Sequence, residues 1–122
     1  MGLTHQKVIV KPAARSRRQA AVACLVDSGA SLTLVPASTL KKLGVRPYRK
    51  ESFVLANGTE MTRQIGVAYV EVKGKGATSD VIFGQRGDEP LLGVITLEMM
   101  GLVLDPFKRQ LLPGRMMLAR ST

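Results

Sequence analysis

The chain has 122 residues, of which 45% are hydrophobic and 4% aromatic, with no Trp. This length fits one domain, and the composition excludes an intrinsically disordered chain. No apolar segment reaches the length of a membrane span and no signal peptide is recognisable, so we expect a cytoplasmic protein. We expect a single domain over residues 1–122, with its core between about 7 and 113 and a C-terminal tail at 114–122.

The formal net charge of +9 comes with two clusters of basic residues. One interpretation is an acidic partner, such as nucleic acid or an anionic membrane. The other is a solvated basic surface, which we favour because few aromatic side chains accompany the basic residues. The clusters are Lys7, Lys11, Arg15, Arg17 and Arg18, which precede the first acidic residue, and Lys41, Lys42, Arg46, Arg49 and Lys50.

Cys24 and His5 are the only residues of their types, so the chain forms no internal disulfide. Cys24 lies in an apolar run and is expected to be a small core residue. A Cys–His dyad is conceivable, but His5 lies in a terminus that we expect to fray. One Cys and one His do not supply the usual ligands of a zinc site. We therefore expect neither a metal nor a cofactor.

The first half of the chain predicts short strands separated by turns. Pro36 fits the first turn of a helix, because the N–H that it lacks would have no partner there, and Gly44 is a natural stop. Asn57-Gly58 between apolar runs indicates a tight hairpin, since both residue types tolerate positive φ. The expected elements are strands at 7–10, 19–26, 32–35 and 52–56 and a short helix that begins at Pro36 and ends at Gly44.

The second half continues in the same pattern, with a long strand of alternating tendency at 64–72. Many short strands, with no alternation of strands and long helices, predict an all-β barrel or sandwich. The further elements are a turn at 73–76, a strand at 78–83, a polar loop at 84–90, an apolar pair and glycine at 91–93, a short helix at 94–100 ended by Gly101, and strands at 102–104 and 110–112.

One motif stands at the end of the second predicted strand. The apolar run 23–26 leads into Asp27-Ser28-Gly29, and a second apolar run follows at 32–35. A carboxylate at the end of a buried strand is costly to bury unless it has a partner or a function. Gly29 permits a tight turn, and the Ser28 hydroxyl both donates and accepts. Because Asp-Ser-Gly is also an ordinary turn tripeptide, its interpretation as a site depends on these apolar runs and on the segment at 91–93.

The segment 25–31, Leu-Val-Asp-Ser-Gly-Ala-Ser, resembles the active-site motif of retroviral-type (retropepsin-like, clan AA) aspartic proteases, with Ser28 where Thr is usual. Pro-Leu-Leu-Gly at 90–93 and Gly-Leu-Val-Leu-Asp-Pro at 101–106 resemble the second half of that domain. The resemblance covers residues 7 to 113 approximately, and it is greatest to the small, single-domain prokaryotic members. It implies an all-β fold, the closed acid-protease barrel with one or two short helices.

The resemblance also implies roles for single residues around the turn. Ser28 would hydrogen-bond across a homodimer and brace the two active-site loops. Gly29 and Ala30 would line the floor of the cleft, and Gly93 would lie close behind the turn. The family often has Arg or another polar residue after that glycine, where this chain has Val94.

The implied activity is that of an aspartic endopeptidase with a protein or peptide substrate. No second Asp-Ser-Gly or Asp-Thr-Gly occurs in the chain, and one carboxylate does not readily act as both general base and general acid. The resemblance therefore implies a homodimer, in which one catalytic Asp27 from each chain activates a water. Ala56, Asn57 and Gly58 would form a flap that closes over the substrate.

Two alternatives stay open at this stage. The same barrel could be a dimeric peptide-binding module without proteolysis, or the chain could be a basic nucleic-acid-binding β-barrel. Peptide binding without turnover would favour the first, and salt-dependent binding of RNA or DNA would favour the second.

Overall fold

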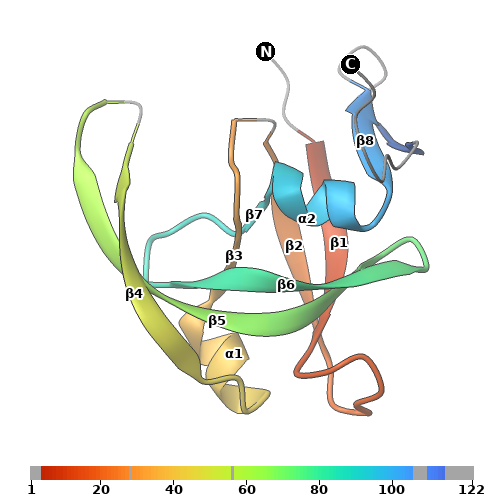
Figure 1. Cartoon of the computed structure of the whole chain (residues 1–122), viewed down its shortest axis with the longest axis horizontal. Coiled ribbons are helices and arrows are strands. Elements are labelled where there is room, and N and C mark those ends of the chain that lie inside the picture. Colours follow the sequence, from red (N-terminus) through yellow and green to blue (C-terminus); the bar gives the residue numbers. More distant parts are fainter. Residues whose placement is uncertain (1–3, 28, 56, 106–109, 115–122) are drawn as a thin grey trace, which may run out of the picture.

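The structure is a computed structural model that describes residues 4–27, 29–55, 57–105 and 110–114. Its elements succeed one another as strands interrupted by two short helices (Figure 1). In chain order they are β1 (Thr4–Lys11), β2 (Ala20–Val26), β3 (Thr33–Pro36), α1 (Ala37–Lys42), β4 (Pro47–Val54), β5 (Glu60–Val72), β6 (Lys75–Gly84), β7 (Leu91–Leu92), α2 (Val94–Met99), β8 (Leu102–Asp105) and β9 (Gln110–Pro113).

Six strands pair around a closed ring in the order β1-β2-β7-β3-β6-β5, because β5 also pairs with β1. The β2–β7 and β3–β6 pairs are parallel, and the other pairs in the ring are antiparallel. The strand β4 pairs only with β5 and lies outside the ring, and β8 and β9 form a separate hairpin. The all-β fold class predicted from the sequence is confirmed.

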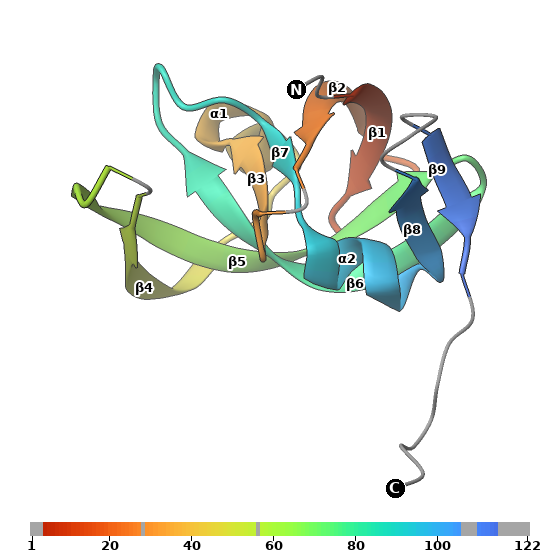
Figure 2. The same ribbon diagram turned by 90° about the horizontal axis from the view of Figure 1, so that it is seen from above.

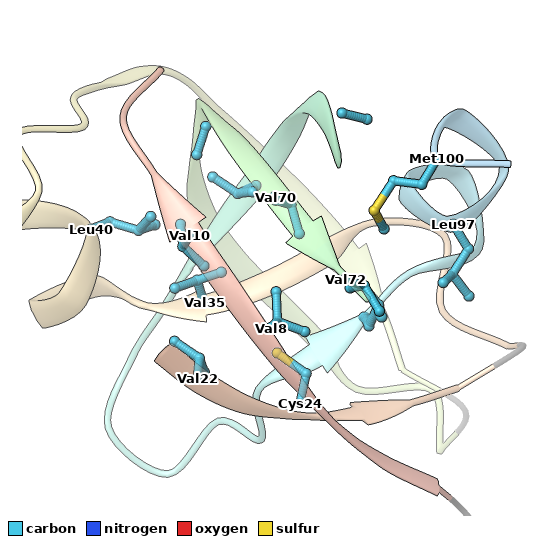
Figure 3. Packing of buried hydrophobic residues seen from close by; sticks show 14 of the residues in the cluster. Val8, Val10, Val22, Cys24, Val35, Leu40, Val70, Val72, Leu97 and Met100 are labelled. Atoms are coloured by element: carbon cyan, nitrogen blue, oxygen red, sulfur yellow. The ribbon is translucent and has the colours of Figure 1, made fainter. Parts of the chain in front are cut away.

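The hydrophobic core fills the interior of this ring and is mostly aliphatic, as the low aromatic content predicts, with Phe83 as an aromatic member. Alternate residues of the paired strands point inward, so one face of each strand is apolar and buried. Each fully buried aliphatic side chain stabilises the fold by roughly 1.5–3 kcal/mol relative to an exposed one. The labelled members of this cluster are Val8, Val10, Val22, Cys24, Val35, Leu40, Val70, Val72, Leu97 and Met100 (Figure 3).

The long strand β5 belongs to two different structures along its length. Residues 65–72 pair with β6 inside the ring, whereas residues 60–66 pair with β4 in a hairpin. In the hairpin most side chains are exposed, and Phe53 is the one side chain of β4 that is partly buried. Figures 1 and 2 show the β4–β5 hairpin extending away from the ring.

Both helices pack apolar side chains against the ring. Leu40 of α1 is fully buried, and Gly44 ends this helix region with φ +83°. Thr96 and Leu97 of α2 are buried, and Gly101 follows that helix with φ +74°. Neither described helix, at six residues each, is long enough to cross a membrane.

The predicted elements are present, with the largest shifts in the hairpin. The strand β4 begins at Pro47 where 52 was expected, and β5 begins at Glu60 where 64 was expected. The physical reason is that backbone pairing forms this hairpin while exposing both of its faces, so no apolar alternation marks its ends. The C-terminal tail beyond Gly114 lies outside the described residues.

The prediction for Cys24 is confirmed and the one for His5 is wrong. Cys24 is fully buried, and burial, together with the charge of Glu89, raises the pKa of its thiol to about 12. His5 lies within β1, opposite Leu25, where strand pairing holds the terminus that we expected to fray. Residues opposite each other in an antiparallel pair point to the same side, so His5 points to the side of Leu25. Cys24 is the neighbour of Leu25 in β2 and points to the opposite side, so His5 and Cys24 form no dyad.

Candidate active site

Asp27 directly follows β2 and is half-buried at the end of that strand. One of its carboxylate oxygens, Oδ1, accepts a hydrogen bond of 2.8 Å from the Gly29 N–H. The Asp27 carbonyl oxygen accepts a second one, of 3.0 Å, from the Ala30 N–H. The backbone of the turn therefore orients the carboxylate, and among the described residues no donor engages its other oxygen, Oδ2.

Gly29 lies close to the Asp27 carboxylate. A Cβ added to this residue would lie 3.3 Å from Asp27 Oδ1. That is tighter than an ordinary van der Waals contact, and it would press on the oxygen that the Gly29 N–H binds. The sequence prediction of a turn suited to glycine is consistent with this geometry.

Gly93 lies directly behind the turn, as the resemblance implied. An added Cβ would stand 2.5 Å from the Ser31 carbonyl oxygen and 2.5 Å from the Leu32 carbonyl carbon. Backbone atoms cannot give way as a flexible side chain does, so this position excludes every side chain. The adjoining strand β7 pairs with both β2 and β3, and it therefore joins the two strands that flank the turn.

The first turn of α2 supports the same segment through its backbone. The N–H of Val94 donates to the Ala30 carbonyl at 2.8 Å, and that of Ile95 donates to the Ser31 carbonyl at 3.1 Å. These two N–H groups have no partner inside the helix, so the turn satisfies them. Val94 therefore braces the turn through its backbone, where a polar side chain is common in the family.

A buried chain of hydroxyl groups, which the sequence analysis missed, lies beneath Gly93. The Gly93 N–H donates to Thr33 Oγ1 at 3.0 Å, and Thr33 Oγ1 donates to Thr96 Oγ1 at 2.7 Å. Thr96 Oγ1 lies 2.9 Å from Ser79 Oγ, which donates to the Asp80 carbonyl at 3.1 Å. Every hydroxyl can thus donate once and accept once. The one feature of the sequence that could have indicated this chain of hydroxyl groups is Thr33, a polar residue inside the apolar run at 32–35.

The tip of the β4–β5 hairpin is a tight turn, as Asn57-Gly58 predicts. The N–H of Gly58 donates to the Leu55 carbonyl at 2.9 Å, and Gly58 has φ +84°. Asn57 does not adopt positive φ, contrary to expectation. Its side chain accepts a hydrogen bond of 2.9 Å from the Thr59 N–H and so closes the turn. Val54 and Leu55, next to the tip, are 71% and 42% exposed.

A second, smaller apolar cluster connects the base of the hairpin to the strands beside the turn. Its buried members come from β3, β5 and β6, and partly buried side chains from the hairpin, from the segment after the turn and from β7 pack against them. It consists of Leu34, Ile65 and Ile82, with Leu32, Phe53, Met61 and Leu91 packed around them.

An ion pair makes a further link between these regions. Arg63 of β5 donates from Nε and Nη2 to the two carboxylate oxygens of Asp88, at 2.7 and 2.9 Å. The Asp88 carboxylate also accepts a hydrogen bond of 2.8 Å from the Gln85 N–H. The Arg63 guanidinium lowers the pKa of Asp88 from its ordinary value, although partial burial opposes this. The hairpin is thereby tied to the loop that leads into β7.

The sequence-predicted site residues fall into two groups in space. Asp27, Gly29, Ala30 and Gly93 are brought together at one turn. Asn57 and Gly58 lie at the hairpin tip, which extends from the ring on the same side as that turn (Figure 1). Ser28 and Ala56 lie outside the described residues. In the part of the chain that the structure describes, no three His, Cys, Asp or Glu side chains gather as metal ligands.

These features define a class of protein, the retroviral-type aspartic proteases. The solution structure of the protease of simian foamy virus (mac) matches this fold with a TM-score of 0.55 and 20% identity, covering 77% of this chain and 91% of the viral chain. The family model described as gag-polyprotein putative aspartyl protease matches residues 17–99, which is more than half of the chain. The chain therefore belongs to this family, and the resemblance found in the sequence is confirmed.

Comparison with curated proteins gave no match. Membership of the family supports aspartic protease activity, that is, a hydrolase acting on protein.

Proposed function

We propose that this protein is a homodimeric aspartic endopeptidase in which each subunit contributes one Asp27. The observation that carries the proposal is the setting of Asp27 within the matched residues 17–99, on a turn held by Gly29, Gly93 and the start of α2. A half-buried carboxylate whose backbone surroundings fix one oxygen is suited to proton transfer through the other.

The dimer follows from the chemistry of peptide hydrolysis. The chain has a single Asp-Ser-Gly motif, whereas attack by water needs a base and the leaving nitrogen needs an acid. Two carboxylates about 3 Å apart do not both ionise readily, so they share one proton and supply both functions. Symmetry therefore provides the second acid that one chain lacks.

In the proposed reaction, the ionised Asp27 takes a proton from a water held between the two subunits. The water oxygen attacks the carbonyl carbon of the peptide bond, while the protonated Asp27 of the partner subunit donates its proton to the carbonyl oxygen. The first Asp27 then passes the proton that it took from water to the amide nitrogen, and the C–N bond breaks. The C=O bond re-forms as one hydroxyl of the intermediate returns its proton to the partner subunit's Asp27. Gly29 and Ala30 form the floor beneath the reacting groups, and Ser28 braces the pair of turns.

The β4–β5 hairpin is the proposed flap, with Ala56, Asn57 and Gly58 closing over the substrate. The exposed side chains of Val54 and Leu55 support this role, because apolar groups at a projecting tip gain stability when a bound peptide covers them. The apolar cluster around Leu34, Ile65 and Ile82 lies between hairpin and turn. This cluster is buried, so it is the exposed Val54 and Leu55 that favour a peptide substrate with apolar side chains.

The first test is cleavage of an unstructured, aliphatic-rich peptide at mildly acid pH by the wild type and by Asp27→Asn. The substitution keeps the size of the side chain and removes its acid–base function, so we expect activity to fall by at least about 10³-fold. Glu98→Gln, an exposed site on α2, is the matched control and should retain activity. Unchanged cleavage by Asp27→Asn would contradict the mechanism.

A mixing experiment tests the need for two subunits. Adding an excess of Asp27→Asn to a fixed amount of wild type should form mixed dimers with one carboxylate and suppress activity. The same excess of the double variant Glu98→Gln/Asp27→Asn is a second inactive chain, and it should suppress activity to the same extent. If neither inactive chain lowers the wild-type rate, one subunit suffices and the dimer is contradicted. Binding of the peptide by the wild type with no turnover would favour a peptide-binding module.

A further inference from the structure

The excess positive charge of this protein is confined to its first 50 residues. Residues 1–50 contain ten Lys and Arg and one acidic residue, so they carry the whole net charge of +9. Residues 51–122 contain eight basic and eight acidic residues. A solvated surface needs no such segregation, and charges of one sign gathered in space attract a partner of the opposite sign.

The fold brings the two basic clusters together. The Arg18 guanidinium, on the connection between β1 and β2, donates a hydrogen bond to the carbonyl of Lys42 at the end of α1. The same guanidinium lies close to Gly44. Segments 11–18 and 41–46 thereby meet at the end of the molecule opposite the turn that follows β2 (Figure 1). We call this region the basic end, and define it by the exposed residues Arg15, Arg17, Lys41, Lys42 and Arg46.

The charges of the basic end are not neutralised from within. Lys11 pairs with Glu71, and Arg49 pairs with Glu51 and Asp80, so those cations are compensated. Among the described residues, no carboxylate pairs with any of the five residues of the basic end. Five exposed cations at one end therefore act together on an approaching anion.

The composition of the basic end favours one class of partner. Protein interfaces have an apolar centre and few Lys, and membrane-surface binding combines basic residues with inserted apolar side chains. The segments 11–18 and 41–46 expose no large apolar side chain. Guanidinium and ammonium groups without an apolar centre suit the phosphates of a nucleic acid.

We propose that the basic end binds the sugar–phosphate backbone of nucleic acid, without reading its sequence. This site lies apart from the Asp27 turn, so binding and peptide hydrolysis occur at separate places on one chain. The role that we give to nucleic acid is an addition to the proposed protease and not an alternative to it. It predicts that Asp27→Asn binds nucleic acid as the wild type does.

The test is fluorescence anisotropy of a labelled single-stranded RNA of about 30 nucleotides and mixed sequence, titrated with the full chain between about 50 and 300 mM NaCl. Five phosphate contacts predict a slope of log affinity against log salt of roughly −3.5 for a single strand. Arg17→Gln/Lys41→Gln should change this slope to about −2 and weaken binding roughly tenfold or more at the lower salt concentrations.

The matched control is Lys73→Gln/Lys75→Gln, which removes the same charge from two exposed lysines, one in the β5–β6 turn and one at the start of β6. It should bind RNA like the wild type, and both double variants should keep the wild-type thermal unfolding and peptidase activity. An equal loss of RNA affinity in both double variants would show that RNA responds to the total charge of the protein and not to the basic end, and it would overturn the proposal. So would the absence of RNA binding at 50 mM salt, tighter binding to vesicles of phosphatidylserine and phosphatidylcholine, or equal competition by polyglutamate.

Discussion

The turn that carries Asp27 and the β4–β5 hairpin are built in opposite ways. The turn is surrounded by backbone: Gly93 touches it from behind, and the N–H groups of Val94 and Ile95 bind its carbonyls. The hairpin exposes nearly all side chains of β4 and connects to the ring through its base. The turn thus cannot move without breaking buried contacts, whereas the hairpin can move at little loss of buried area.

This difference matches what the proposed reaction needs from each region. The acid–base group must be held to within a fraction of an ångström, because catalysis depends on pre-organised geometry. A flap must instead open to admit a peptide and then cover it. The turn under the carboxylate is closely packed against backbone, whereas the proposed flap exposes most of its side chains.

The same glycine-to-alanine change in both regions gives the largest predicted contrast. Gly93→Ala places a methyl group against backbone atoms of Ser31 and Leu32, so we expect a loss of about 3 kcal/mol or more in the free energy of unfolding. Gly58→Ala meets no atom within 4 Å and has only the strain of φ +84°, about 1 kcal/mol. Denaturant unfolding of both variants measures the contrast. Equal losses would show that the turn is not the more tightly packed region.

The buried hydroxyl chain gives the next largest effect. Thr96→Val keeps the shape of the side chain but leaves the hydroxyls of Thr33 and Ser79 each without one partner. We expect a loss of about 2 kcal/mol, measured by denaturant unfolding. Thr78→Val, at an exposed position of β6, is the matched control and should change stability by no more than about 0.5 kcal/mol. A loss as small as that of the control would remove the hydroxyl chain as a support of the turn.

The ion pair that ties the hairpin to the loop before β7 gives the smallest effect and a defined pH dependence. The Arg63 guanidinium lowers the pKa of Asp88 in the folded state, so this pair stabilises the fold above the unfolded pKa near 3.8. The stabilisation is lost as pH falls through the lowered folded pKa. We therefore expect Asp88→Asn to lose about 1–2 kcal/mol at pH 7 and progressively less as pH falls below 3.8, measured by urea unfolding. Glu89→Gln, exposed in the same loop, should show no such pH dependence.

Local patterns in the sequence predicted most elements, because apolar alternation and turn residues act within a few positions. Gly44 and Gly101 end the helices where expected, and the apolar runs at 23–26 and 32–35 form the strands on either side of Asp27. The early start of β4 was not predictable in this way. Its residues are exposed on both faces, and pairing with β5 alone makes them a strand.

The sequence by itself determined which residue is the candidate acid, because the chain contains one Asp-Ser-Gly motif and no Asp-Thr-Gly. The motifs around it also indicated the family. Only the tertiary structure decided what supports that acid. Thr33, Ser79 and Thr96 stand far apart in the chain, and no local pattern relates them. The same holds for the basic end, where the contact of Arg18 with Lys42 unites two clusters. Such long-range contacts depend on how the strands close into a ring, which a local pattern does not specify.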